Sequence, residues 1–287
     1  MKNYLVKLAL VVAIPLCLFA AACGSDDNSY EGTSIVLSGT DLDKAKQQVA
    51  TAIYRYNQIG EDAFDEISDA DGPFIDGETY TFVITPEGVL RAHAADPDLV
   101  GDDLSETIDS DGSDVIEGIS QAASSAGGLA TYRFNNPATG EEEPKNSWVV
   151  LHDNLIFGSG DYITEAEWAQ QIVDEALNLY DDIGTDAFDV INDDSGDFIQ
   201  GEIYVFVTGL DGFSKAHAAN PTLQNTDRSD LVDINGKRIT DALLEGATPQ
   251  GDWVDYWRTN PATGEEEAKH SWVVLRDDYV FGAGYYE

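Results

Sequence analysis

The sequence predicts an α+β protein built from two tandem units, each with a long N-terminal helix packed on a five- to six-stranded antiparallel sheet. The first observation behind this prediction is a repeat. Residues 129–162 and 253–286 align without a gap, at a constant offset of 124 residues, and are identical at 20 of 34 positions. The second and third observations are a helical apolar pattern and a set of strand patterns that occur once in each unit. Similarity at a fixed spacing marks an internal duplication, so we expect one unit at 41–162 and another at 163–287.

Each unit opens with apolar residues spaced three and four apart, which places them on one face of a helix. In the first unit this pattern covers residues 42–67, and in the second it runs from Ala169 to Tyr180. Gly60 and Gly184 occupy equivalent positions near the end of the pattern, and they predict where each long helix breaks or ends.

Strand patterns follow each helix. Alternating or β-branched residues predict strands at 78–85 and 202–208, with short return strands at 91–93 and 215–217. A shorter helix is expected at about 115–125 and 239–245. The repeated stretch then has the pattern of three antiparallel strands, connected by the turn sequence Asn-Pro-Ala-Thr-Gly and by Asp-Asn or Asp-Asp.

The N-terminus predicts export and a lipid anchor. Residues 1–22 contain two lysines and then a short apolar run, which is typical of a signal peptide and too short for a membrane span. The sequence Ala-Ala-Ala-Cys that ends at Cys23 resembles the lipobox of bacterial lipoproteins, in which the cysteine is acylated. The alternative is an ordinary signal peptide cleaved after an alanine. Residues 23–40 are polar and form a predicted flexible tether, so we expect a protein anchored to the cell envelope that faces the periplasm or the exterior.

The charge is strongly acidic, with 54 Asp and Glu against 15 Lys and Arg and a net charge of −39. A nucleic-acid backbone would be repelled by such a chain, so nucleic acid is excluded as a partner. The acidic residues are spread through both units, which is typical of a solvated surface that stays soluble in high salt. Of the two cysteines, Cys17 lies in the predicted signal peptide, so no disulfide is expected in the mature chain.

Several motifs of the second unit occur in the order found in one known family. They include Ala-His at 216–217, Asn-Gly-Lys at 235–237, Gly-Asp-Trp-Val at 251–254, and Phe-Gly-Ala-Gly-Tyr-Tyr at 281–286. Together they resemble the Cache family, single-Cache type, whose members are extracytoplasmic ligand-sensing domains of bacterial chemoreceptors and sensor kinases. The resemblance covers residues 163–287 almost completely and the first unit less well. It implies a PAS-like fold that binds a small organic molecule, often a short carboxylate, in a cleft over the sheet.

Lys145 and Lys269 are the first candidates for ligand binding, because basic residues are scarce and this lysine is present in both units. Such a lysine can balance the charge of a ligand carboxylate. The alternative is a surface salt bridge to Glu143 or Glu267, which contributes little stability. The sequence leaves both interpretations open.

Two basic residues and two histidines form the next candidate group. Arg91 precedes His93 by two residues, and Lys215 precedes His217 in the same way. Residues i and i+2 of a strand share a face, so each pair is expected to point the same way and to contact an anion. The favoured alternative for the histidines is that they anchor the loop before the next proline.

The last candidates are aromatic. Tyr256 and Trp253 lie on opposite faces of one predicted strand, so only one of them can face a cleft. The first unit keeps Tyr132 at the position of Tyr256. An aromatic wall also permits a cationic amine as ligand, and the general alternative is ordinary core packing.

The sequence predicts a non-enzymatic binding protein without cofactor or metal. The histidines lack metal-site spacing, and no nucleophile or phosphate-loop motif is present. We expect a lipid-anchored sensor that binds a short carboxylate or a similar small metabolite in the second unit. Such a protein would store the ligand, present it, or pass its bound state to a membrane receptor or sensor kinase. The alternative is a structural or protein-interaction lipoprotein whose cleft is closed by side chains.

Overall fold

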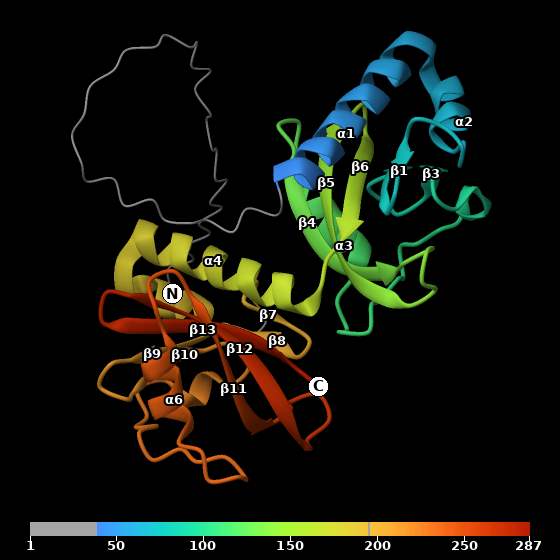
Figure 1. Ribbon diagram of the computed structural model, residues 1–287. Coiled ribbons are helices and arrows are strands. Elements are labelled where there is room, and N and C mark those ends of the chain that lie inside the picture. The colour runs from blue at the N-terminus through green and yellow to red at the C-terminus, as the bar shows by residue number, and fades with distance from the viewer. Residues whose placement is uncertain (1–38, 195) are drawn as a thin grey trace, which may run out of the picture. The chain divides into compact units, whose positions relative to one another are not determined.

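The structure is a computed structural model that describes residues 39–194 and 196–287 (Figure 1). The predicted signal peptide, the predicted lipidation site Cys23 and nearly all of the predicted tether lie outside these residues. Among the helices of the described part, none is long and apolar enough to cross a membrane.

The N-terminal half contains one long helix, two short helices and six strands. They are α1 (Gly39–Ile59), α2 (Ala63–Ile67), β1 (Ile75–Asp76), β2 (Thr79–Ile84), β3 (Leu90–His93), α3 (Val115–Ala122), β4 (Gly128–Asn135), β5 (Glu142–His152) and β6 (Leu155–Tyr162). The strands form one antiparallel sheet in the order β1-β2-β6-β5-β4, and β3 pairs with β2. The long helix, the six strands and the short α3 confirm the α+β prediction for this half.

The sheet of the N-terminal half has a helix on each side. Along β2, Thr81 donates a hydrogen bond to Gln48 of α1, whereas Phe82 packs with Ile119 of α3 on the other side. This alternation follows from the two-residue period of a strand. The sheet therefore separates two apolar layers, one under α1 and one under α3 (Figure 1).

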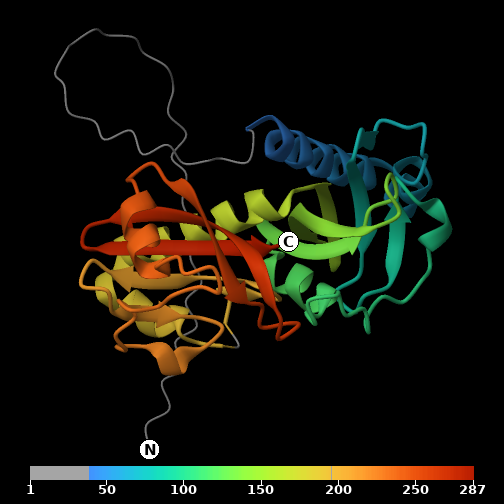
Figure 2. The ribbon, with the colours of Figure 1, turned by 60° about the horizontal axis from the view of Figure 1, so that its bottom comes forward.

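The C-terminal half repeats this plan. Its elements are α4 (Glu165–Ile183), α5 (Ala187–Ile191), β7 (Ile199–Gln200), β8 (Ile203–Tyr204), β9 (Phe206–Gly209), β10 (Ser214–His217), α6 (Ile239–Gly246), β11 (Asp252–Thr259), β12 (Glu266–Arg276) and β13 (Tyr279–Tyr286). The five-stranded antiparallel sheet has the order β10-β9-β13-β12-β11, and β7 pairs with β8 separately. Figure 2 shows α4 and α6 on opposite sides of the strands β11–β13.

Local sequence signals explain where the long helices begin and end. Thr164 accepts a hydrogen bond from the backbone of Glu167, and the Glu167 side chain bonds back to the backbone of Thr164. This capping box satisfies backbone groups at the start of α4. Gly60 and Gly184 both have φ of +65°, a conformation that glycine adopts without steric cost, so α1 and α4 end where predicted.

Candidate ligand-binding pockets

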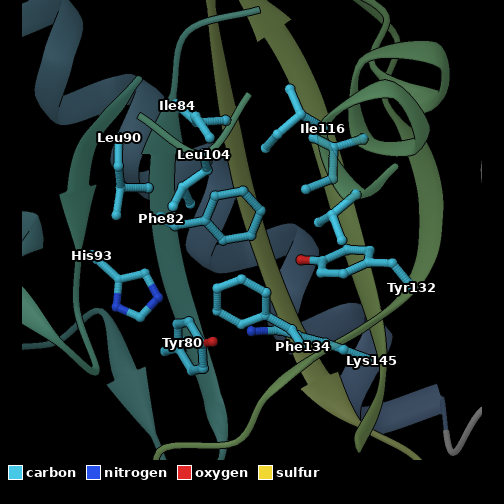
Figure 3. A pocket seen from close by; sticks show the side chains of 12 residues that line it. Tyr80, Phe82, Ile84, Leu90, His93, Leu104, Ile116, Tyr132, Phe134 and Lys145 are labelled. Atoms are coloured by element: carbon cyan, nitrogen blue, oxygen red, sulfur yellow. The ribbon is translucent and has the colours of Figure 1, made fainter. Parts of the chain in front are cut away.

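Each half contains a pocket on the sheet face away from its long helix. The N-terminal pocket lies between the sheet and α3 (Figure 3). Its lining consists of Tyr80, Phe82, Ile84, Leu90, His93, Leu104, Val115, Ile116, Ile119, Tyr132, Phe134 and Lys145.

The C-terminal pocket lies between its sheet and α6. Its lining consists of Tyr204, Phe206, Thr208, Ser214, His217, Arg228, Leu231, Ile239, Thr240, Leu243, Tyr256 and Arg258. Every lining position of the N-terminal pocket except Lys145 has its counterpart 124 residues later in this second lining. The two pockets are therefore the same site, formed once in each half.

Four lining residues are identical in the two pockets: Tyr80 and Tyr204, Phe82 and Phe206, His93 and His217, and Tyr132 and Tyr256. Hydrogen bonds fix the tyrosines in the same way. The Tyr132 and Tyr256 hydroxyls each lie 2.9 Å from a serine Oγ of the neighbouring strand. The Tyr80 and Tyr204 hydroxyls lie 3.0 and 3.1 Å from the hydroxyl of a second tyrosine. These paired hydroxyls hold the aromatic rings at defined positions in both pockets.

The four residues shared by the two pockets form a common frame, and the glycine of the repeated Phe-Gly motif provides space for its phenylalanine. A Cβ atom on Gly158 would lie 2.2 Å from the ring of Phe82, and one on Gly282 would lie 2.4 Å from the ring of Phe206. Neither glycine has a positive φ, so the requirement is space and not backbone conformation. The glycines of β6 and β13 thus allow a phenylalanine to lie flat over the strand beside each pocket.

Five lining positions change from apolar in the first pocket to polar in the second. The pairs are Ile84 and Thr208, Leu90 and Ser214, Leu104 and Arg228, Ile116 and Thr240, and Phe134 and Arg258. The N-terminal pocket is therefore mainly hydrocarbon, whereas the C-terminal pocket carries two guanidinium groups and three hydroxyl groups.

The two arginines are the most informative residues of the C-terminal pocket. In the described part of the chain, no ion pair or side-chain hydrogen bond is formed by the guanidinium group of Arg228 or Arg258. Burial and the positive charge of Arg258 lower the pKa of Arg228. With 54 acidic residues in the sequence, two arginines that face one pocket without an acidic partner indicate a site for an anion.

Two hydroxyl groups complete the polar wall. Thr208 and Ser214 are buried and face each other in the register between β9 and β10. Residues directly opposite one another on neighbouring strands point to the same face. The two hydroxyls therefore lie side by side in the pocket and can donate to or accept from a ligand oxygen.

Lys145 and Lys269 lie inside the protein, with exposed fractions of 1% and 0%. The Nζ atom of Lys145 lines the N-terminal pocket and lies 3.2 Å from the centre of the Tyr80 ring. Lys269 lies outside the pocket lining, and its Nζ donates a 3.2 Å hydrogen bond to the Tyr286 hydroxyl. Burial lowers the pKa of both lysines.

The surface salt bridge considered from the sequence is not formed by either lysine among the described residues. Glu143 instead accepts hydrogen bonds from Asn136 and Thr139. Glu267 makes the equivalent bonds in the second half. These bonds close the Asn-Pro-Ala-Thr-Gly turns, which explains why both the turn and the glutamate are repeated.

The expectation that Arg91 and Lys215 share a face with the following histidines is wrong. The pairing of β3 with β2 shifts between Leu90 and Ala92, so that Arg91 is the extra residue of a β-bulge, and Lys215 is the extra residue in the other half. Arg91 pairs with Glu61 at 3.1 Å, and Lys215 pairs with Asp211 at 2.7 Å. Neither basic residue lines either of these two pockets, whereas both histidines do.

The histidines are neutral at ordinary pH, because burial is the main effect that lowers the pKa of each to about 3. Nδ1 of His93 accepts a 2.8 Å hydrogen bond from the backbone N–H of Asp96. His93 therefore anchors the loop before Pro97 and also lines its pocket. In the second half, Nδ1 of His217 is buried without a hydrogen-bond partner among the described residues.

Trp253 lies on the sheet face opposite the pocket. Its ring packs on Trp272 and Tyr285, with ring centres 5.5 and 5.9 Å apart. Tyr256, whose side chain points the other way, lines the C-terminal pocket, and Tyr132 lines the N-terminal one. Of the two faces that the strand pattern allowed, the pocket therefore uses the one that carries Tyr256.

The sequence reasoning missed Arg228 and Arg258. The candidates were mainly residues shared by the two units, whereas these two arginines stand where the first unit has Leu104 and Phe134. Two features of the sequence could have identified them: basic residues are rare in this chain, and each arginine has an apolar counterpart in the first unit.

Comparison with known proteins gives the following. The family model described as Cache domain matches residues 43–287, which includes both halves. No curated protein matches the sequence. A methyl-accepting chemotaxis protein from Vibrio parahaemolyticus is 19% identical, with 42% of this chain and 88% of that chain covered and a TM-score of 0.37.

Two further solved structures are similar. A Cache chemosensory domain, described in connection with carboxylic acid recognition, is 25% identical over 42% of this chain and 92% of its own, with a TM-score of 0.36. The periplasmic sensory domain of the Campylobacter jejuni chemoreceptor Tlp1 is 12% identical over 86% of this chain and 87% of its own, with a TM-score of 0.29.

The family model spans most of the chain in one continuous match, across both sheets and both pockets. Cache domains are extracytoplasmic sensory domains that bind ligands and are not catalytic, which agrees with the non-enzymatic class predicted from the sequence. This chain belongs to the Cache family.

Proposed function

We propose that this protein is an extracytoplasmic sensor that binds a small organic anion, a short carboxylate, in its C-terminal pocket. The observation that carries the proposal is the pair of arginines, Arg228 and Arg258, which line one pocket without an acidic partner among the described residues. A cation that no protein group neutralises is most stable when a bound anion supplies the missing charge.

The chemistry of the pocket fits a carboxylate with a further polar group. A guanidinium group forms two parallel hydrogen bonds with a carboxylate, a geometry that a neutral ligand cannot use equally well. The hydroxyls of Thr208 and Ser214 can bond to an additional ligand oxygen. Tyr256 and His217 provide the aromatic and neutral part of the wall.

Of the residues selected from the sequence, His217 and Tyr256 belong to this proposed site. Lys269 contacts the site indirectly, because its ammonium group lies 3.7 Å from the centre of the Tyr204 ring, and Tyr204 lines the pocket. Trp253 and Lys215 lie outside the proposed site, as described above.

The cellular setting that we propose rests on the sequence. The two halves are tandem Cache-like copies, the mature chain is acylated at Cys23, and the bound state is passed to a membrane receptor or sensor kinase. Mass spectrometry of the N-terminal peptide tests the anchor: an acylated Cys23 is expected, and an unmodified peptide that begins after the cysteine contradicts it.

A thermal-shift screen of short carboxylates, amino acids and amines in high salt tests the proposed ligand class. High salt is used because it screens the repulsion among the many acidic groups. A ligand at a hundred times its dissociation constant should stabilise the fold by about 2.7 kcal/mol. Carboxylates are expected to raise the melting temperature and amines are not. No shift with any compound would favour a structural lipoprotein with a closed cleft.

A further inference from the structure

The N-terminal pocket contains a buried amine that faces the cavity without a hydrogen-bond acceptor. Lys145 is 1% exposed and its side chain lines the pocket. Among the described residues, no hydrogen bond or ion pair is formed by its Nζ atom, which lies over the Tyr80 ring. Its counterpart Lys269 donates to the Tyr286 hydroxyl instead. A buried ammonium or amine group without an acceptor is costly, so Lys145 is where a ligand oxygen would be stabilised.

A second donor lies at the same end of the pocket. Because Nδ1 of His93 accepts from the backbone of Asp96, the neutral ring carries its proton on Nε2. Figure 3 shows this second nitrogen turned toward the cavity, on the same side as Lys145 and Tyr80. Lys145 and His93 thus form a polar end with two donors.

Apart from the hydroxyls of Tyr80 and Tyr132, which lie 3.0 and 2.9 Å from the hydroxyls of Tyr162 and Ser147, the rest of the cavity is lined by hydrocarbon. Its walls are Phe82, Ile84, Leu90, Leu104, Val115, Ile116, Ile119 and Phe134. The two positions that hold arginines in the C-terminal pocket are Leu104 and Phe134 here. A second charged group of a ligand would be desolvated against these walls without a partner.

We propose that the N-terminal pocket is a second ligand site, which binds a small uncharged molecule with an aliphatic or aromatic body and one accepting oxygen. The oxygen accepts from Nζ of Lys145 and Nε2 of His93, and the body contacts the α3 side of the cavity. Ketones, esters and amides of a few carbon atoms have this chemistry. Burial, which disfavours charged groups in this apolar cavity, also lowers the pKa of Lys145 well below its usual value.

The two pockets therefore take different classes of ligand. The C-terminal pocket selects an anion through Arg228 and Arg258, and the N-terminal pocket selects a neutral molecule through its apolar wall and Lys145. This assignment stands on residues of the N-terminal half alone, so it does not depend on the carboxylate proposal.

Titration calorimetry of the full chain with 4-methylpentan-2-one tests the second site. The ketone should bind the wild-type protein, and Lys145→Met, which keeps the volume but removes the donor, should weaken binding at least tenfold. Ile119→Trp, which fills the cavity, should abolish binding. Arg258→Phe alters only the other pocket and should leave ketone binding unchanged.

A matched anion separates the two classes. In the protein that carries both Arg228→Leu and Arg258→Phe, 4-methylpentanoate has a similar shape to the ketone but carries a charge, and it should bind at least tenfold more weakly. Failure of the ketone to bind, equal binding to the wild-type and Lys145→Met proteins, or stronger binding of the anion would each overturn the second site. Carboxylate binding to the wild-type C-terminal pocket is measured independently, so the failure of one proposal is distinguishable from the failure of the other.

Discussion

The two pockets of this protein have the same frame and opposite linings. Tyr80, Phe82, His93 and Tyr132 have identical counterparts in the C-terminal half, and the same hydroxyl pairs hold the tyrosines. The remaining lining of the N-terminal pocket consists mainly of hydrocarbon side chains, whereas that of the C-terminal pocket includes arginines and hydroxyl groups. The comparison shows that side chains at a few positions can change the class of ligand while the sheet and its hydrogen bonds stay the same.

The changed positions are distributed over strands, a loop and the short helix α3 or α6 of each half. Arg258 is near the end of strand β11, and Arg228 lies in the loop that precedes α6. Of the unchanged residues, Phe82 and Phe206 lie opposite Gly158 and Gly282 of the neighbouring strand, where an added Cβ atom would meet the phenylalanine ring. Ligand class and fold are thus specified by different residues.

The largest effect on stability is expected when the arginines are introduced into the apolar pocket. Leu104→Arg with Phe134→Arg places two cations among hydrocarbon side chains without acidic partners. Fully buried unpaired charges cost about 3–5 kcal/mol, and because both positions are partly exposed we expect about 2 kcal/mol. Urea unfolding measures this loss. Leu104→Met with Phe134→Leu is the control for volume, and a charged variant as stable as this control would contradict the description of the pocket as apolar.

A loss of similar size, and equal in the two halves, is expected when the packing of Phe82 or Phe206 is disturbed. Gly158→Ala and Gly282→Ala each force a methyl group against a phenylalanine ring, and overpacking of this kind costs about 1–3 kcal/mol. Gly140→Ala is a poor control because Gly140 has a φ of +77°, whereas Gly118→Ala has open space at the new methyl group. Thermal unfolding should show a loss in both pocket variants and none in Gly118→Ala; a loss in one half only would show that the frames differ.

The two histidines should make both halves sensitive to acid. Their folded-state pKa is about 3, below the unfolded value of about 6.5. Between these values the unfolded chain binds a proton that the folded chain does not bind, so stability falls as the pH drops from about 6.5 toward 3, and the histidines have no such effect above that window. For His93 the free energy of unfolding should fall by at most about 1.4 kcal/mol per pH unit, and partly exposed His217 should contribute a smaller decrease. Urea unfolding from pH 7 to pH 4 should show a shallower loss for His93→Gln and His217→Gln; unchanged slopes would contradict neutral, buried histidines.

The smallest effects are expected at the bulge residues. Arg91 and Lys215 form exposed ion pairs outside both pockets, and such pairs are worth about 0–1 kcal/mol. Arg91→Ala and Lys215→Ala should therefore leave ligand affinity within twofold of wild type, as measured by calorimetry. A tenfold change in affinity would return these residues to the binding sites.

The sequence predicted the fold well because the duplication repeats the residues that build a sheet. Turn sequences, Gly60 and Gly184, and the Phe-Gly motif all act locally, so their consequences can be read from neighbouring residues. The bulge at Arg91 could not be predicted, because one extra residue in a strand leaves no mark in an alternating pattern of four residues. The break at Val205 between β8 and β9 was not predicted either.

The site was harder to predict than the fold, because its specificity lies in residues that the two halves do not share. Tyr132, Tyr256 and the histidines could be found by comparing the repeats, and they form the frame. Arg228 and Arg258 come from separate segments, and only the folded chain brings them to one cavity. Repetition therefore indicated where the pockets are, and the departures from repetition indicate what they bind.

Calorimetric titration of a short carboxylate found in the thermal-shift screen tests the central claim most directly. Wild-type protein is compared with Arg228→Leu, Arg258→Phe, in which the C-terminal pocket receives the residues of the N-terminal one. Each charged hydrogen bond contributes about 1.5–3 kcal/mol, so the double variant should bind at least a hundredfold more weakly while its fold is kept. Affinity within threefold of wild type in a folded double variant would contradict the assignment of this pocket as the carboxylate site.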